Sequence, residues 1–267
     1  QAYWYYFTVD KTLSDDISIS IQVIPYYDIN NYGAGLCGCG WKGKMAYAFD
    51  KDPSYLYIVN PSNIQSISSP STYVWEVGDG RNNKIVNMKH FYNELVVFQE
   101  EKGSLGGCVT LMQGSDVEDM GKINISNYYG TMNANSVEVI KPSLGGHNIY
   151  FLSKKGIMVS TGKEIQFAEN FDMVKNYFDP TDSDCIRNGY EHNMYLNYDS
   201  AFNILKIGLT TGSATQNNVF LVYDLTTRTF MCDTYANNFS CEYECDALYG
   251  NSPIVRLAGG QANGFIY

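Results

Sequence analysis

The sequence predicts an all-β fold, in particular a β-propeller of about five or more antiparallel blades, for two reasons. First, short runs of Tyr, Leu, Val, Ile and Phe recur behind turn residues along the whole chain, with no matching helices between them. Such runs, bounded by Asn, Asp, Pro and Gly, are typical of strands. Second, the runs that open successive units are spaced by 40, 54, 45 and 60 residues, obtained by subtraction of their starts at Tyr55, Leu95, Ile149, Met194 and Ile254. A four-stranded blade occupies roughly 40–50 residues, and insertions lengthen it.

A β-sandwich is the alternative fold, because it also contains many short strands with turns every 8–12 residues or so. The propeller is favoured because the aromatic and aliphatic phrase returns at the distance of a blade and not of a single strand. The phrases are nearly continuous in apolar residues, as expected for strands covered on both faces by neighbouring blades.

Length and composition fit one domain. The chain has 267 residues, and all-β domains reach roughly 200–250 residues as single units. We therefore expect residues 1–267 to form one propeller-like domain, complete or incomplete. Because the chain begins at Gln1, inside a strand-like run and without an initiator Met, we also expect it to belong to a larger polypeptide. The sequence contains no run of about 18 apolar residues, so we expect no membrane-spanning helix.

Aromatic residues make up 15% of the chain and include 23 Tyr, which suits pleated sheets. Charged residues make up only 17%, which excludes a disordered, heavily solvated chain. The net charge of −10 disfavours general nucleic-acid binding, because an acidic surface repels phosphates. The lysine pairs 42 and 44, and 154 and 155, are the local exceptions.

The first third of the chain predicts strands separated by loops. Residues 1–9 and 16–27 are two β-rich runs, the second alternating apolar Ile and Val with Ser and Gln. Residues 31–45 contain five glycines, which indicates a loop or a close approach of backbones. A hairpin with its tip at 51–54 follows, and the Ser, Asn, Pro and Gly-rich residues 60–82 predict a long surface loop.

The remainder predicts antiparallel strands interrupted by one short inserted helix. A strand pair turns at Tyr92 and Asn93, residues 108–113 add a third strand, and residues 137–162 give three more around two Gly turns. The helix is expected around Asn170 to Tyr177, before Asp179 and Pro180. A run of strands follows to residue 234, and the last pair joins residues 252–260 to 264–267.

No catalytic, cofactor or metal residue is assigned from the sequence. Seven cysteines, an odd number, argue against a complete disulfide framework. Three of them resemble zinc ligands in their clustering, although reduced, buried thiols are favoured over a metal site; they are Cys232, Cys241 and Cys245. A carboxylate cluster suggests either Ca²⁺ or, with greater weight, a solvated acidic turn; it consists of Asp179, Asp182 and Asp184. The three histidines are expected to be ordinary polar residues; they are His90, His147 and His192.

Three segments carry a more specific pattern. Ile85 to Phe98 follows I-x-x-x-x-x-F-x-x-x-L-h-V-F, with h apolar, and Ile149 to Ile157 follows h-Y-F-h-x-x-x-G-I. Val219 to Phe230 follows V-h-h-V-Y-D-x-x-T-x-x-F. In these segments the chain resembles phage tail proteins of the stabilisation or nozzle type, which short-tailed phages carry. The resemblance extends over about residues 84–230.

The resemblance implies a structural β-propeller subunit of a virion tail, with no enzymatic activity and no cofactor. Such subunits form a ring, typically a hexamer, that extends the tail channel below the portal and helps to retain or conduct DNA. The implied partners are copies of itself, neighbouring tail or portal-adaptor proteins, and DNA that passes without sequence-specific binding. The implied location is the virion tail, assembled in the host cytoplasm. A net acidic chain suits DNA that slides past.

Two alternatives from other functional classes stay open. One is a secreted carbohydrate-binding or glycoside-active propeller, in which surface Tyr or the three Trp residues stack on sugars; the latter are Trp4, Trp41 and Trp75. The repeated S-x-D-x-G-x-T-W turns of sialidases do not occur in the sequence. The other alternative is a generic protein-interaction propeller.

Overall fold

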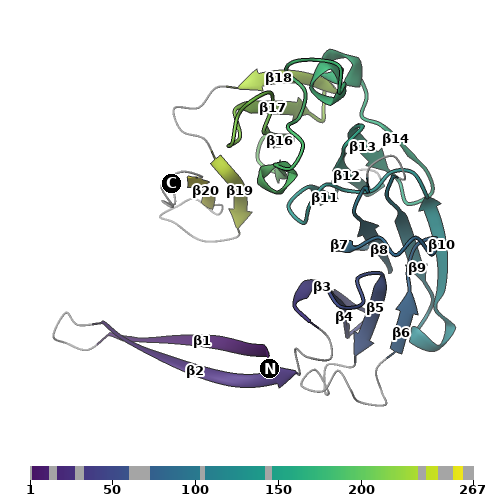
Figure 1. Ribbon diagram of the computed structural model, residues 1–267, viewed down its shortest axis with the longest axis vertical. Helices are drawn as coiled ribbons and strands as arrows, with labels where there is room; N and C mark the ends of the chain where they lie inside the picture. Colours follow the sequence, from purple (N-terminus) through teal and green to yellow (C-terminus); the bar gives the residue numbers. More distant parts are fainter. Residues whose placement is uncertain are drawn as a thin grey trace.

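The chain forms four antiparallel sheets of four strands each (Figure 1). The computed structural model describes residues 2–11, 17–27, 33–59, 73–102, 106–141, 146–233, 239–245 and 255–260. Side chains are described for those ranges between 33 and 233. Each sheet is built from four strands that follow one another in the sequence and pair in that order. The chain is therefore organised as successive four-stranded blades, and the predicted all-β class is confirmed.

The strand bounds of the four blades are as follows. The first blade contains β3 (Gly35–Trp41), β4 (Lys44–Phe49), β5 (Tyr55–Val59) and β6 (Tyr73–Glu76). The second contains β7 (Ile85–Phe91), β8 (Glu94–Gln99), β9 (Val109–Gln113) and β10 (Gly121–Ser126). The third contains β11 (Val137–Ile140), β12 (Asn148–Ser153), β13 (Gly156–Ser160) and β14 (Ile165–Phe167). The fourth contains β15 (Tyr195–Asp199), β16 (Ile204–Leu209), β17 (Val219–Asp224) and β18 (Thr229–Asp233).

The four blades lie along an arc, with the first strand of each on the inner side and the last on the outer side (Figure 1). β7 lies between β3 and β11, and β11 contacts β15, so neighbouring blades meet along their inner strands. This radial arrangement is propeller-like. Two further strand pairs, β1 (Ala2–Lys11) with β2 (Ile17–Tyr27) and β19 (Phe239–Cys245) with β20 (Val255–Gly260), form two-stranded antiparallel sheets.

The true repeat differs from the one that the sequence phrase suggests. The blades begin at residues 35, 85, 137 and 195, which gives steps of 50, 52 and 58 by subtraction. The phrases used for the prediction fall on β5, β8, β12 and β15, which are the third, second, second and first strands of their blades. The predicted spacing is therefore about the length of a blade, but the predicted units do not start at the first strand of each blade. The reason is that any strand buried on both faces carries the same apolar residues.

Apolar cores fill the spaces between successive blades. On β8, Leu95 and Val97 pack into the core shared with the first blade, whereas Val96 and Phe98 pack toward the third blade. All four residues are completely buried. A strand covered on both faces must be apolar at every position, which is why this run lacks the polar alternation of a half-buried strand.

Two predictions for the first blade are wrong in part. The glycine-rich residues 31–45, predicted as a loop or a close approach of backbones, include β3, so the loop alternative is wrong there. Residues 73–76 of the predicted loop 60–82 form β6, while 60–72 lie outside the described residues. On β3, Gly38 pairs with Tyr47, and a Cβ on Gly38 would lie 3.2 Å from Cδ1 of that ring. The glycine thus makes room for a cross-strand aromatic ring, and such close packing is one reason for a Gly inside a strand.

The predicted helix is replaced by two short 3₁₀ segments, η4 (Phe171–Met173) and η5 (Lys175–Phe178). Asn170 precedes η4 in the left-handed conformation, with φ of 61° and no capping side-chain bond. Val174 and Phe178 are buried in the core between the third and fourth blades. Core packing, and not a helical pattern in the sequence, therefore determines the conformation of these two 3₁₀ segments. Two further 3₁₀ turns are η3 (Val117–Asp119) and η6 (Glu191–Asn193).

The prediction for the last strand pair, residues 252–260 with 264–267, missed β19. β20 pairs with β19, a segment not predicted as a strand, and residues 264–267 lie outside the described residues. None of the helices in the described part of the chain has the length and apolar character needed to cross a membrane.

A buried carboxylate ties the second blade to the third. Glu101 is 7% exposed and follows β8. Its oxygens accept hydrogen bonds from the backbone N–H of Gly130 at 2.9 Å, from Ser153 Oγ at 2.6 Å and from the backbone N–H of Lys154 at 2.6 Å. Because charge-assisted hydrogen bonds are the strong ones, this contact fixes the relative position of the two blades.

Candidate functional site

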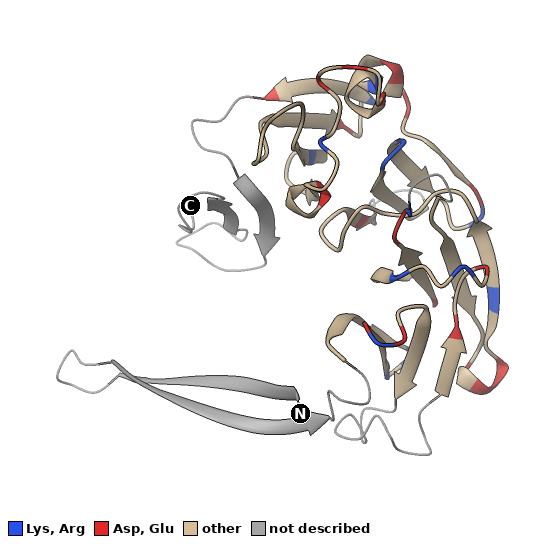
Figure 2. Cartoon of the chain, in the orientation of Figure 1, with Lys and Arg blue, Asp and Glu red and all other residues tan. Residues whose placement is uncertain are grey.

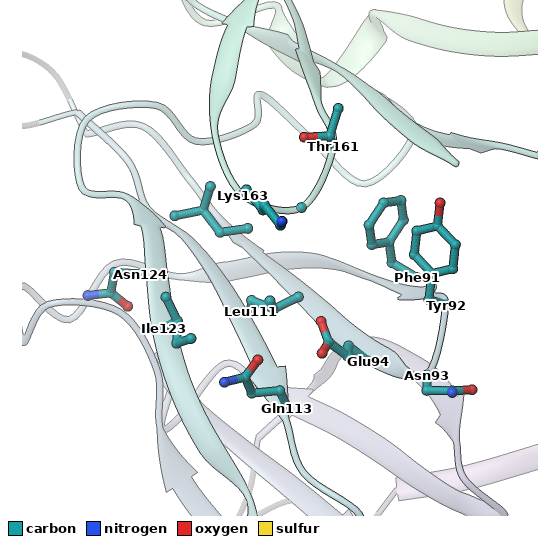
Figure 3. A pocket seen from close by; sticks show the side chains of 12 residues that line it. Phe91, Tyr92, Asn93, Glu94, Leu111, Gln113, Ile123, Asn124, Thr161 and Lys163 are labelled. Carbon is teal, nitrogen blue, oxygen red and sulfur yellow. The ribbon is translucent and has the colours of Figure 1, made fainter. Parts of the chain in front are cut away.

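A groove of about 590 Å³ opens between the second and third blades (Figure 3). It is bordered by the turn between β7 and β8, by the adjoining parts of β9 and β10, and by the turn between β13 and β14. These turns lie at the same ends of their blades. The volume falls within the range of about 300–1,000 Å³ typical of small-molecule sites.

The β7–β8 turn holds Tyr92 in an uncommon conformation. Its φ is 55°, in the left-handed region, where bulky residues are rare. Trp41, itself 1% exposed, supports this turn from the first blade by donating a hydrogen bond from Nε1 to the carbonyl of Asn93 at 3.0 Å. Two-residue hairpin turns commonly require this left-handed conformation, so the hydrogen bond from Trp41 holds an ordinary hairpin turn in place beside the groove.

An aromatic stack fixes the Tyr92 ring. The His147 ring lies parallel to it, with centroids 4.2 Å apart and an interplanar angle of 11°. Phe91 meets Tyr92 edge-on at 4.8 Å. The Tyr92 hydroxyl oxygen accepts a hydrogen bond from the backbone N–H of His147 at 2.6 Å. The residue remains 49% exposed and lines the groove.

The opposite wall is a turn held in place by its own hydrogen bonds. Ser160 Oγ donates to the carbonyl of Glu164 at 2.7 Å and accepts from the backbone N–H of Gly162 at 3.1 Å. Gly162 has φ of 87°, and a Cβ there would lie 2.7 Å from Cε1 of Phe91. The glycine therefore lets this turn close onto the Phe91 ring, which joins the two walls of the groove.

Polar side chains with unused hydrogen-bonding capacity surround an apolar floor. Leu111, Ile123 and Ile125 form the floor. Figure 3 shows Lys163 and Thr161 on the turn side and Glu94 and Gln113 on the side of the second blade. Within the described part of the chain, these four side chains make no hydrogen bond or ion pair with other residues. The groove thus offers one cation, one carboxylate, an amide and a hydroxyl to a ligand.

The histidines proved to have different roles. His147 backs the groove through its stack on Tyr92, which sequence reasoning treated as an ordinary loop position. His192 belongs to η6 and stacks on Tyr190 at 6.1 Å, and His90 lies on β7. The structure brings no two of these three together in one site.

The acidic residues after η5 form turns of their own. Asp179 accepts hydrogen bonds from the backbone and hydroxyl of Thr181, and Asp182 accepts one from the backbone N–H of Asp184. Those bonds lower the pKa of Asp179. Among the described residues, no group of three metal-ligating side chains is placed to hold an ion. Cys232 is exposed on β18, while Cys241 and Cys245 lie in β19, where side chains fall outside the description.

Neither tryptophan whose side chain is described lines the groove. Trp41 is buried, and Trp75 packs against the core between the first and second blades. Trp4 lies in β1, where side chains fall outside the description. The exposed ring at the groove is Tyr92, which the sequence marked only as a turn residue.

Charged residues are dispersed along the described blades (Figure 2). The two lysine pairs noted in the sequence do not form a basic patch. Lys44 pairs with Asp116 at 3.1 Å, and Lys154 pairs with Glu191 at 2.7 Å. Lys42 donates to the carbonyl of Gly114, and Lys155 lies over the ring of Tyr128.

Comparisons with known proteins agree with the fold. No protein-family model matches the chain, and no curated protein matches it. The crystal structure of an ancestral GH74 enzyme is similar at 14% identity and a TM-score of 0.50, over 87% of this chain and 30% of that one. The extracellular domain of a putative one-component system from B. thetaiotaomicron is similar at 13% identity and a TM-score of 0.50, over 100% of this chain and 34% of that one. The chain therefore spans about a third of the length of these structures, and the likeness concerns the fold alone.

Proposed function

We propose that this chain is a propeller-like protein that works by binding, and that its ligand is a carbohydrate. The observation that carries the proposal is the groove between the second and third blades. It combines an exposed, rigidly backed Tyr92 ring with unengaged polar side chains over an apolar floor. A concave, mostly apolar site with a few convergent polar groups is the usual form of a small-molecule site.

The fold comparisons support this proposal more than they support a virion tail. One similar structure is an enzyme of the GH74 class and the other is an extracellular domain. We propose binding without turnover, because hydrolysis of a glycoside uses two carboxyl groups facing each other across the bond, about 5–10 Å apart. Among the residues lining the groove, Glu94 is the single carboxylate.

The test is a glycan array probed with the purified chain, combined with a reducing-sugar assay on soluble polysaccharides. The proposal expects retention of particular glycans and no release of sugar. Failure to retain any glycan would overturn the carbohydrate proposal, and release of sugar would show that the protein is an enzyme.

A second candidate is the virion tail subunit, and a specific observation favours it. The three segments that resemble phage nozzle proteins fold as strand pairs of three consecutive blades, β7 with β8, β12 with β13, and β17 with β18. Under this proposal the chain forms a ring, typically hexameric as the resemblance implies, with neighbouring tail or portal-adaptor proteins above and below it. DNA would pass through the ring without sequence-specific contacts.

Sedimentation and negative-stain microscopy of the purified chain test this second candidate. It expects closed rings of several copies. A species that remains monomeric at all concentrations, and alone in the micrographs, would contradict it.

A further inference from the structure

We infer that the groove between the second and third blades binds a neutral oligosaccharide, with one sugar ring stacked on Tyr92. This inference rests on the proposed binding function and names the ligand class and the residues that would select it.

The Tyr92 ring is held in place by its neighbours. One face is covered by His147, the edge is met by Phe91, and the hydroxyl is held by the backbone N–H of His147. The free face of a tyrosine ring is electron-rich. The C–H groups on one face of a pyranose carry partial positive charge and form a flat apolar surface, which matches such a ring. Because Tyr92 is already immobilised, binding orders no flexible side chain there.

The positive and negative charges that line the groove balance. Lys163 contributes one positive charge and Glu94 one negative charge, and the other polar lining groups are neutral. A phosphate or an acidic sugar would gain from Lys163 but would be repelled by Glu94, and a cationic ligand would meet the reverse. A neutral polyol meets neither cost.

The hydrogen-bonding groups of the groove match those of a sugar. A sugar hydroxyl both donates and accepts. Glu94 accepts, Lys163 donates, and Gln113 and Thr161 do both. None of these side chains is engaged elsewhere within the described residues, so a ligand would break no contact among them. The Gln113 amide and the Glu94 carboxylate lie on the same wall, below the turn that carries Lys163 (Figure 3).

The groove is large enough for more than one sugar ring. A volume of about 590 Å³ is larger than one sugar ring requires and suits a short oligosaccharide. The two walls are joined by the contact of Gly162 with Phe91, and the blades behind them are joined by Glu101. The groove is therefore formed before the ligand arrives.

The experiment measures the affinity of the wild-type chain for neutral and acidic oligosaccharides of equal length by titration calorimetry. The inference expects binding of neutral members, weakened about tenfold by Tyr92→Ala and less by Tyr92→Phe, which keeps the ring but loses the hydroxyl that accepts from the His147 N–H. Glu94→Gln should weaken binding of the same ligands severalfold. The matched control is Tyr128→Ala, which removes a ring of similar exposure, 53%, outside the groove.

A second substitution guards against loss of folding. Tyr92→Gly removes the ring but suits the left-handed backbone, so it should fold at least as well as Tyr92→Ala. Circular dichroism checks that each variant is folded. If folded Tyr92→Gly binds neutral glycans as tightly as wild type, the groove is not the site, although the binding function stands. If acidic glycans bind more tightly than neutral ones, the ligand class is wrong. If the folded wild type binds no oligosaccharide at all, the proposed carbohydrate function fails as well.

Discussion

The buried carboxylate of Glu101 gives the sharpest prediction about stability. Glu101→Ala would leave three donors between the second and third blades without their acceptor: the backbone N–H groups of Gly130 and Lys154, and Ser153 Oγ. Glu101→Gln would keep one acceptor oxygen but place an NH₂ group against at least one of the donors. The alanine variant should therefore be the more damaging of the two.

The magnitude follows from the number and burial of those donors. Leaving one buried donor unsatisfied costs on the order of 1–3 kcal/mol, and breaking a buried charged network costs about 3–5 kcal/mol. Water that enters the space left by the side chain would satisfy part of the loss. We therefore expect the free energy of unfolding to fall by about 3–5 kcal/mol for Glu101→Ala and about 1–3 kcal/mol for Glu101→Gln.

Thermal denaturation followed by circular dichroism measures the effect. At about 2–4 °C per kcal/mol for a chain of this size, Glu101→Ala should lower Tm by roughly 6–20 °C and Glu101→Gln by roughly 2–12 °C. The control is Glu169→Ala, which removes an exposed ion pair with Arg228 and should leave Tm nearly unchanged. A Tm for Glu101→Ala within about 2 °C of wild type would refute the claim that this carboxylate joins the blades.

Three further predictions concern other parts of the chain. Trp41→Phe removes the hydrogen bond from Nε1 to the carbonyl of Asn93. It should weaken oligosaccharide binding severalfold at temperatures where the variant is fully folded. Equal affinity for variant and wild type in calorimetry would contradict the supporting role of Trp41. Hydrogen bonds from Ser115 Oγ and from the backbone N–H groups of Asp116 and Ser115 lower the pKa of Asp119 to about 2. Because this folded-state pKa is below the unfolded value of about 3.9, the stabilisation is present above pH 4 and is lost as the pH falls toward 2. The difference in Tm between wild type and Asp119→Asn should therefore shrink over that interval, and a difference independent of pH would contradict the assignment. Burial raises the pKa of the Cys37 thiol to about 12, whereas Cys232 is exposed, so iodoacetamide at pH 8 should label Cys232 well before Cys37 in peptide mapping; equal rates would show that Cys37 is accessible as a thiolate.

Strands that are buried on both faces could be predicted from the sequence. β5, β8 and β12 carry almost uninterrupted apolar runs because a neighbouring blade covers each face. The outermost strands β10 and β14 were missed for the converse reason, since most of their side chains are partly or fully exposed. The strand at which each blade begins could not be predicted, because the first, second and third strands carry the same apolar residue types.

The groove could be predicted only in part. Tyr92 and Asn93 were predicted as a turn, and the turn lies where expected. The value of Tyr92 as a platform depends on His147, 55 residues away and on the next blade. No local pattern encodes a contact between blades, so neither the stack nor the position of Lys163 opposite Glu94 can be derived from composition or spacing.

The most direct test of the binding site is amide hydrogen exchange of the intact chain with and without an oligosaccharide that it retains. Our account predicts slower exchange in the two turns that form the walls, at Tyr92 and Asn93 and at residues 161–163, with little change at the opposite ends of the blades around Tyr128. Protection confined to residues around Tyr128, with both groove turns unchanged, would contradict it.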